Sequence, residues 1–107
     1  MTRCALRSFC IGAVTILLVA CKPPPGGVTY SGGDGSTVEK AVIVNAANDM
    51  QGMTAEYVWL ADHYPGFHNR NQFQRAQNGH CYDQMDIVTK DGQQRSVYFD
   101  ISPNSGK

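Results

Sequence analysis

The sequence lacks several features that mark whole classes of protein. Its nine lysines and arginines only balance its nine aspartates and glutamates, and the basic residues form no cluster. Because nucleic-acid binding needs a clustered basic face, we expect no nucleic-acid partner. No apolar run reaches the roughly 20 residues that cross a bilayer, which argues against a permanent transmembrane helix.

The cysteines are poorly placed for a disulfide framework. Of the four, Cys4 and Cys10 lie in an N-terminal segment that we expect to be removed, and Cys21 lies at its end. We therefore predict no intramolecular disulfide. Cys81 stands among residues expected to face inward, so we predict that it is a buried and unreactive core residue.

The N-terminal segment has the three parts of a secretory signal. Arginines without acidic residues occupy 1–8, an apolar run follows over 9–19, and a small residue precedes a cysteine. The run Leu18-Val19-Ala20-Cys21 resembles the lipobox of bacterial lipoproteins. That resemblance implies removal of residues 1–20, a diacylglyceryl group on the Cys21 sulfur and usually a third chain, such as palmitate, on the new amino terminus. At about 0.8 kcal/mol per buried methylene, such chains hold a protein on a membrane essentially without release.

The same resemblance implies a location. Lys22, rather than an aspartate, follows the cysteine, which in lipoproteins of the enterobacterial type implies transfer to the outer membrane. We therefore expect a cell-envelope protein anchored by lipid at Cys21, with its domain in the periplasm and the outer membrane favoured over the inner one. The alternative is an ordinary cleaved signal that leaves Cys21 as a thiol.

The rest of the chain divides into a linker, one small domain and a tail. Proline and glycine dominate residues 21–36, which predicts a flexible linker, interrupted by a segment at 28–30 that is able to dock on the domain. Residues 37–102 can form a single domain, and 103–107 a short C-terminal tail. A domain of this size buries only about 60% of its unfolded-chain surface, so a deep enzyme pocket is not expected.

The hydrophobic pattern of the domain predicts the order β-α-β-β-β. A β-branched run over 38–45 predicts a strand that is covered on both faces or central in its sheet, and apolar spacing over 53–64 predicts a helix that ends at a Pro-Gly pair. The dipeptide Asn78-Gly79 predicts a tight hairpin turn. The polar segment 67–77 before this turn is strand-like, and alternation over 80–89 and 96–101 predicts the last two strands. The predicted inward residues of these last two strands are Cys81, Met85, Ile87, Val97, Phe99 and Ile101. This order implies a two-layer α+β domain in which one helix packs on a mostly antiparallel sheet.

The spacing within the predicted helix also orients it. Five apolar residues fall on one side, which predicts the face that packs on the sheet. Trp59 and His63 then lie at the border of this face, and the polar segment 45–52 is expected to be a loop. The predicted buried face consists of Met53, Tyr57, Leu60, Ala61 and Tyr64.

The apolar residues of the last two predicted strands lie on the same face of the sheet only if the loop between these strands has an odd number of residues. Residues 90–92, with Gly92 in a left-handed conformation, supply a three-residue loop that puts Ile87 on the same side as Val97. A two-residue turn would instead place Ile87 opposite Ser96.

A second resemblance covers most of the chain beyond the signal. The segments 33–36, 55–60, 64–66 and 98–102 are similar to parts of a small domain of uncharacterised bacterial proteins, some of them lipoproteins. The similarity implies no established activity and no site residue. After Ser102 the chain departs from that domain, which ends with two phenylalanines and a glycine.

Aromatic side chains are the predicted functional surface, because aromatics are favoured as anchors of protein interfaces. Trp59 and His63 at the edge of the helix, and Tyr82 and Tyr98 on the outward side of their strands, are the predicted partner contacts. Trp59 can serve in this way only if its ring stays partly exposed.

A metal site or a catalytic site is the alternative. The run His80-Cys81-Tyr82-Asp83 contains metal-ligand types, but adjacent strand residues point to opposite faces, which does not suit a zinc site. We expect no metal and no cofactor. Two carboxylates from among Asp83, Asp86 and Asp100 could support acid–base chemistry, although such residues are more often solvated.

Together these features predict a non-catalytic envelope lipoprotein that binds another protein, as periplasmic inhibitors, immunity proteins and assembly accessories do. An enzyme is less expected. The alternatives are a small periplasmic hydrolase or metal-binding enzyme that uses His80, Asp83 or Asp100, and a purely structural envelope component.

Overall fold

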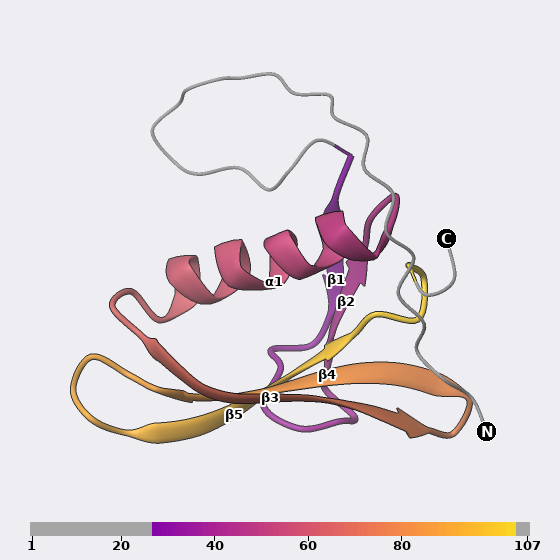
Figure 1. Ribbon diagram of the computed structural model, residues 1–107. Coiled ribbons are helices and arrows are strands. Elements are labelled where there is room, and N and C mark those ends of the chain that lie inside the picture. The colour runs from indigo at the N-terminus through magenta and orange to yellow at the C-terminus, as the bar shows by residue number, and fades with distance from the viewer. Residues whose placement is uncertain (1–26, 105–107) are drawn as a thin grey trace.

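The computed structural model describes residues 27–104, in which one helix packs on a five-stranded sheet (Figure 1). Along the sheet the strand order is β1-β2-β5-β4-β3; β2 and β5 are parallel, and the other neighbours are antiparallel. The predicted α+β class is confirmed, with β1 as an addition to the predicted order. The elements are β1 (Thr29–Gly32), β2 (Val42–Asn45), α1 (Asp49–His63), β3 (His68–Gln77), β4 (His80–Val88) and β5 (Gln94–Asp100).

The turn between β3 and β4 has the form that the sequence predicts. Asn78 and Gly79 both have positive φ, 52° and 78°. That backbone is typical of a type I′ turn, whose twist matches the twist of the two strands it joins. The tight hairpin is therefore confirmed, and it pairs Gln77 directly with His80.

The loop between β4 and β5 is also as predicted. Gly92 has a φ of 90°, and the Thr89 N–H donates to the Gln93 carbonyl at 2.8 Å. A three-residue loop therefore joins the strands, and Ile87 lies opposite Arg95. The two-residue alternative is excluded.

Helix α1 lies across one face of the sheet, the inner face (Figure 1). Val97 and Phe99 of β5 and Ile101 directly after it are buried, which confirms their predicted inward positions. The Trp59 ring of α1 meets the Phe99 ring edge-on, with centroids 5.5 Å apart. The buried core consists of Val28, Val42, Val44, Ala46, Ala55, Trp59, Leu60, Cys81, Met85, Ile87, Val97, Phe99 and Ile101.

Helix α1 begins earlier than predicted. The expected loop over 45–52 is wrong from Asp49 onward, because Asn48 caps the helix: its side-chain oxygen accepts from the Gln51 N–H at 2.9 Å. An asparagine at this position satisfies one of the first-turn donors that have no partner within the helix. The polar residues before the apolar stripe are therefore the cap and first turn of the helix.

The buried face of α1 also differs from the predicted one. Met53, which the apolar spacing places in that face, is exposed, whereas Trp59 and Glu56 are buried. The small residues Gly52 and Ala55 let this side of the helix approach its neighbours closely. The prediction failed because a glutamate in the buried face does not register as apolar.

The domain begins earlier than predicted, because residues 28–36 belong to the fold and not to a linker. Val28 is buried, and β1 pairs antiparallel with β2. The Tyr30 hydroxyl donates to the Ala55 carbonyl of α1 at 2.7 Å. These contacts make β2 a central strand, as predicted, and residues 21–26 of the predicted linker lie outside the described part of the chain.

The domain also ends later than predicted. Asn104, assigned to the tail 103–107, is fully buried, and its side-chain oxygen accepts from the Ala46 N–H at 2.8 Å. The Asn104 N–H donates to the Ile101 carbonyl at 3.0 Å, which forms a turn directly after β5. This C-terminal turn, residues 101–104, completes the packing beside α1.

Cys81, at the start of β4, is disulfide-bonded, which corrects the prediction of no intramolecular disulfide. The other three cysteines precede residue 27, so its partner lies outside the described residues. The predicted burial of Cys81 is confirmed.

The predicted signal peptide, lipobox and lipidation site at Cys21 lie outside the described residues. Within residues 27–104, no helix is both long enough and apolar enough to cross a membrane.

Candidate functional site

Trp59 is not the partly exposed contact that the sequence predicts, whereas His63 beside it is exposed. Trp59 is only 6% exposed, and the His63 ring stacks on it with centroids 3.7 Å apart and an angle of 11° between the planes. His63 Nδ1 also lies 2.9 Å from the Trp59 carbonyl oxygen. The rotation of α1 turns the indole into the core, where it cannot anchor a partner.

The face of the sheet turned away from α1, the outer face, carries the other two predicted contacts. Cross-strand pairing aligns Phe73, Gln84 and Tyr98 across β3, β4 and β5 in what we call the aromatic row. Phe73 is 45% exposed and Tyr98 is half-buried. Phe73 was not among the predicted contacts, although a lone phenylalanine in a polar strand was a usable signal.

Tyr82 lies on the outer face but is buried, which corrects the prediction that it is an outward contact. Its ring stacks near that of His80, with centroids 5.9 Å apart. Burial raises the pKa of the Tyr82 hydroxyl, and the negative charges of Asp100 and Glu39 raise it further. Because Glu39 belongs to the β1–β2 loop, this loop approaches the Tyr82 end of the outer face.

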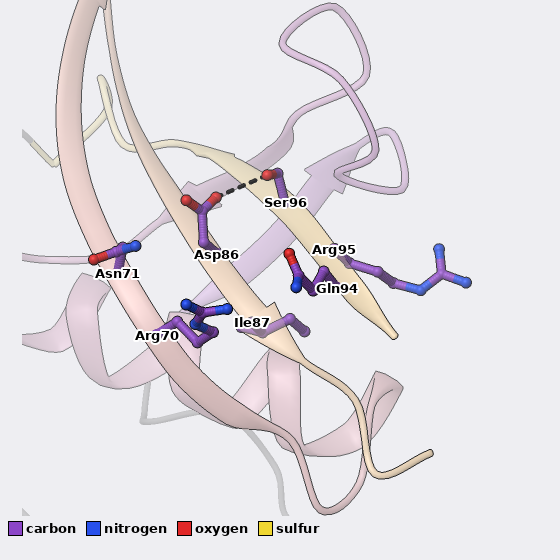
Figure 2. Close-up of a pocket in the computed structure, with 7 residues that line it drawn as sticks. All are labelled: Arg70, Asn71, Asp86, Ile87, Gln94, Arg95 and Ser96. Atoms are coloured by element: carbon purple, nitrogen blue, oxygen red, sulfur yellow. Dashed lines mark hydrogen bonds between the residues drawn. The ribbon is translucent and has the colours of Figure 1, made fainter. Parts of the chain in front are cut away.

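Beyond the aromatic row, the outer face contains an open groove of about 250 Å³ (Figure 2). Asp86 Oδ1 accepts from Ser96 Oγ at 2.7 Å and from Gln84 Nε2 at 3.1 Å, so donors hold this carboxylate in place. A β-bulge in β3 lies at Arg70, and the Arg95 side chain extends away from the groove. The lining residues are Arg70, Asn71, Asp86, Ile87, Gln94, Arg95 and Ser96.

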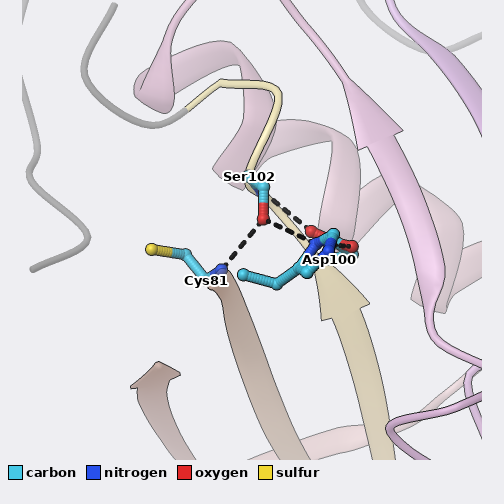
Figure 3. Close-up of polar contacts among 4 residues, drawn as sticks. Cys81, Asp100 and Ser102 are labelled. Atoms are coloured by element: carbon cyan, nitrogen blue, oxygen red, sulfur yellow. Dashed lines mark hydrogen bonds and ion pairs between the residues drawn. The ribbon is translucent and has the colours of Figure 1, made fainter. Parts of the chain in front are cut away.

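Asp100 and Ser102 lie beside Cys81 where β4 begins and β5 ends (Figure 3), and the His80 side chain joins them. His80 Nδ1 lies 3.0 Å from Asp100 Oδ2 and 3.3 Å from Ser102 Oγ. Ser102 Oγ accepts from the Cys81 N–H at 2.9 Å, and the Ser102 N–H donates to Asp100 Oδ1 at 3.0 Å.

These are the residue types of a hydrolase triad in the wrong geometry. In a triad the acid binds one ring nitrogen of the histidine, and the serine binds the other. Both Asp100 and Ser102 meet the same nitrogen of His80, so this ring cannot accept the serine proton while the aspartate orients it. The cluster joins two strand ends, and it does not support the hydrolase alternative.

Asp83 takes part in a second polar cluster, which lies on the inner face. Glu56 of α1 is 0% exposed and faces Asp83 of β4, which is 4% exposed. Burial raises the pKa of Glu56 well above its ordinary value, and hydrogen bonding and charge from Asp83 add to the rise. Burial also raises the pKa of Asp83, while hydrogen bonds to Glu56 and Gln74 oppose that rise. At least one of the two carboxyls is therefore favoured in its neutral form.

A cavity of about 20 Å³ adjoins this pair. It has room for roughly one water molecule, and none for an organic substrate. Asp83 therefore does not support the hydrolase alternative either. The cavity is lined by Asp49, Gly52, Met53, Glu56, Gln74, Asp83, Ile101 and Asn104.

The chain matches no protein-family model, no curated protein and no solved structure. The resemblances to lipoproteins and to a small bacterial domain therefore stay predictions. Within residues 27–104, no group of three or more histidine, cysteine, aspartate and glutamate side chains could hold a metal ion.

Proposed function

We propose that the protein is a lipid-anchored lipoprotein of the cell envelope whose domain binds another protein through the outer face of its sheet. The observation that carries this proposal is the aromatic row, with Phe73 45% exposed beside an open groove. A large exposed aromatic on a rigid sheet is a typical interface anchor, because it offers apolar area at little entropic cost.

The shape of the hollows favours a protein over a small molecule. The outer groove is open and smaller than the roughly 300–1,000 Å³ of typical ligand pockets, and the inner cavity accommodates about one water molecule. A flat surface with one aromatic anchor suits a macromolecular partner. We propose Phe73 and Tyr98 as partner contacts. Trp59 is not proposed as a contact, because it is buried.

The strand order supports access to this surface from the periplasm. The chain enters the domain at β1, on one edge of the sheet, whereas β3 forms the other edge. Because residues 28–36 belong to the fold, residues 21–27 alone join Cys21 to the domain. At about 3.5 Å per residue they reach at most roughly 25 Å, so the domain lies close to the lipid with β3 farthest along the sheet from the tether.

The partner is tested by crosslinking in intact cells and purification of the full chain. We expect one stoichiometric protein partner with the wild type and at least a tenfold lower yield with Phe73→Ser. Met53→Ser is the matched control, because Met53 on α1 is 43% exposed and lies away from the outer face. Equal capture by wild type and Phe73→Ser, or no capture at all, would contradict the proposed surface.

The anchor is tested separately by fractionation and intact mass. Cys21→Ser is expected to move the protein from the membrane pellet to the soluble fraction, and the wild type is expected to carry lipid mass. A wild-type mass without lipid, or a Cys21→Ser chain that still pellets, would contradict the anchor. A disulfide between Cys21 and Cys81 in the mature protein would also contradict the anchor, because a sulfur bound to lipid cannot form one.

A further inference from the structure

The carboxyl groups of Glu56 and Asp83 and the side-chain amide of Asn104 line one buried cavity beside α1. Together they offer more hydrogen-bond acceptors than donors. When both carboxyls are ionised, the two oxygens of Glu56 and Oδ1 of Asp83 find no donor among the described residues, and Asn104 Nδ2 finds no acceptor there; all four atoms are buried. Buried polar groups are nearly always hydrogen-bonded, because an unpaired one costs about 1–3 kcal/mol. Four unpaired atoms around one small cavity point to a missing component.

Part of what is missing is a proton. Ionised carboxylates only accept hydrogen bonds, so Glu56 and Asp83 cannot bond to each other when both are charged. One proton between them converts the repulsion into an O–H···O hydrogen bond. Their burial on facing elements, α1 and β4, makes this neutralisation the physically cheaper state.

The second missing component is an oxygen atom that accepts a hydrogen bond from the Asn104 amide. Its Oδ1 is held by the Ala46 N–H at 2.8 Å, so its Nδ2 turns toward Gly52, where an added Cβ would lie 2.6 Å away. The cavity therefore presents a donor on one side and the acceptors of Glu56 and Asp83 on the other. A water molecule can satisfy both sides, whereas the amide hydrogens would repel a metal cation.

The volume agrees with this occupant. A cavity needs about 10–15 Å³ to hold a water molecule, and this one has about 20 Å³. We propose that Glu56, Asp83 and Asn104 form a buried site that binds one proton and one water molecule, and that this site ties α1 and the C-terminal turn to β4.

A bound proton is the main way in which the negative charge of this site is neutralised, as the described side chains around it show. Asp49 of α1 and the uncharged Gln74 of β3 line the cavity, and no lysine, arginine or histidine of the described chain does so. Tyr30 of β1 stays neutral, because burial and then the charges of Asp62 and Glu56 raise its pKa to about 12. Strands β2 and β5 contribute apolar side chains to this core.

The site makes stability depend on pH in a defined direction. Between the ordinary pKa of a glutamate, about 4.3, and the raised pKa of Glu56, the native state holds one proton more than the unfolded chain. In this window stability falls as pH rises, and the unfolding equilibrium constant grows about tenfold per pH unit. Above the raised pKa both carboxylates ionise, and their repulsion separates α1 from β4.

The test is urea unfolding of the purified full chain at a series of pH values from about pH 5 upward, as far as stability continues to fall. The fluorescence of Trp59, the single tryptophan, reports the packing of α1. We expect the tenfold rise per pH unit in the wild type and its loss, in large part, in Glu56→Gln, whose amide hydrogens replace the shared proton. Glu39→Gln is the matched control at the other glutamate, which is exposed, and it should keep the wild-type slope.

A wild-type slope near zero, or equal slopes in Glu56→Gln and Glu39→Gln, would overturn the shared proton. Should Glu56→Gln fail to fold, infrared spectroscopy of the wild type at neutral pH decides instead: the carbonyl stretch of one protonated carboxylic acid is expected, and its absence overturns the proposal. A high-resolution crystal structure should show one water within hydrogen-bond distance of Asn104 Nδ2. A metal ion or an empty cavity there would overturn the water site.

Discussion

Asp83 and Asp86 lie on the same strand, yet their carboxyl groups have opposite environments. Asp83 points to the inner face, where Glu56 is its neighbour and its Oδ1 finds no donor among the described residues. Asp86 points to the outer face, where Ser96 and Gln84 donate to it in an open groove. Alternation along one strand therefore places one aspartate where it binds a proton and the other where it stays solvated.

The same contrast holds for the two faces as a whole. The inner face is closed by α1 and the C-terminal turn, and its hollow takes about one water molecule. The outer face carries the exposed Phe73 beside a groove of about 250 Å³. A domain this small has one core, and it lies on the inner side of the sheet, so the outer side is left open to solvent.

The largest expected effect separates the aromatic residues of the two faces. Trp59→Ala removes a buried ring that contacts Phe99 and should lower the free energy of unfolding by about 3–5 kcal/mol. Phe73→Ala should lower it by less than about 1 kcal/mol, because much of this ring is already in solvent. Circular dichroism during urea unfolding of the full chain measures both. Similar losses in the two variants would contradict the division into a closed and an open face.

A smaller effect is expected at the C-terminal turn. Asn104→Ala leaves the buried Ala46 N–H without its acceptor and should lower the free energy of unfolding by about 1–3 kcal/mol. Asn45→Ala, at an exposed position of β2, is the control and should stay within about 0.5 kcal/mol of the wild type. If the two variants unfold at the same urea concentration, the turn does not seal the inner face.

The smallest effect, and the most specific, compares the two aspartates of β4. Asp83→Asn removes the negative charge beside Glu56, so the pKa of Glu56 should fall. The free energy of unfolding of the variant should therefore stop decreasing at a lower pH than that of the wild type. Above that point the variant should gain on the wild type by about 1.4 kcal/mol per pH unit. Asp86→Asn should run parallel to the wild type throughout. Parallel curves for all three proteins would show that Asp83 and Glu56 titrate independently.

Local signals in the sequence were sufficient for the turns and for the register of the last strands. Asn78-Gly79 and Gly92 adopt positive φ because their side chains permit it, and each turn then sets which residues lie opposite one another. The predicted inward positions of β5 follow directly, since side chains alternate along a strand. These features depend on neighbours in the chain, which is why they are readable without a structure.

The candidate site depends on contacts that no local pattern contains. Glu56 reads as a solvent-facing helix residue until Asp83 of a distant strand is placed against it, and that misreading rotated the predicted helix and put Trp59 at its border. Phe73 gains its significance from cross-strand alignment with Tyr98, which requires the whole sheet.

The sequence by itself determined the α+β class, the turns and the alternation of the late strands, because periodicity and turn chemistry act over a few residues. Tertiary structure alone decided that residues 28–36 and Asn104 belong to the domain: β1 is too short to be recognised without β2, and the asparagine has no role until Ala46 and Gly52 surround it. It also decided which carboxylates are buried together, because the energy of a buried charge depends on what faces it and not on its position in the chain.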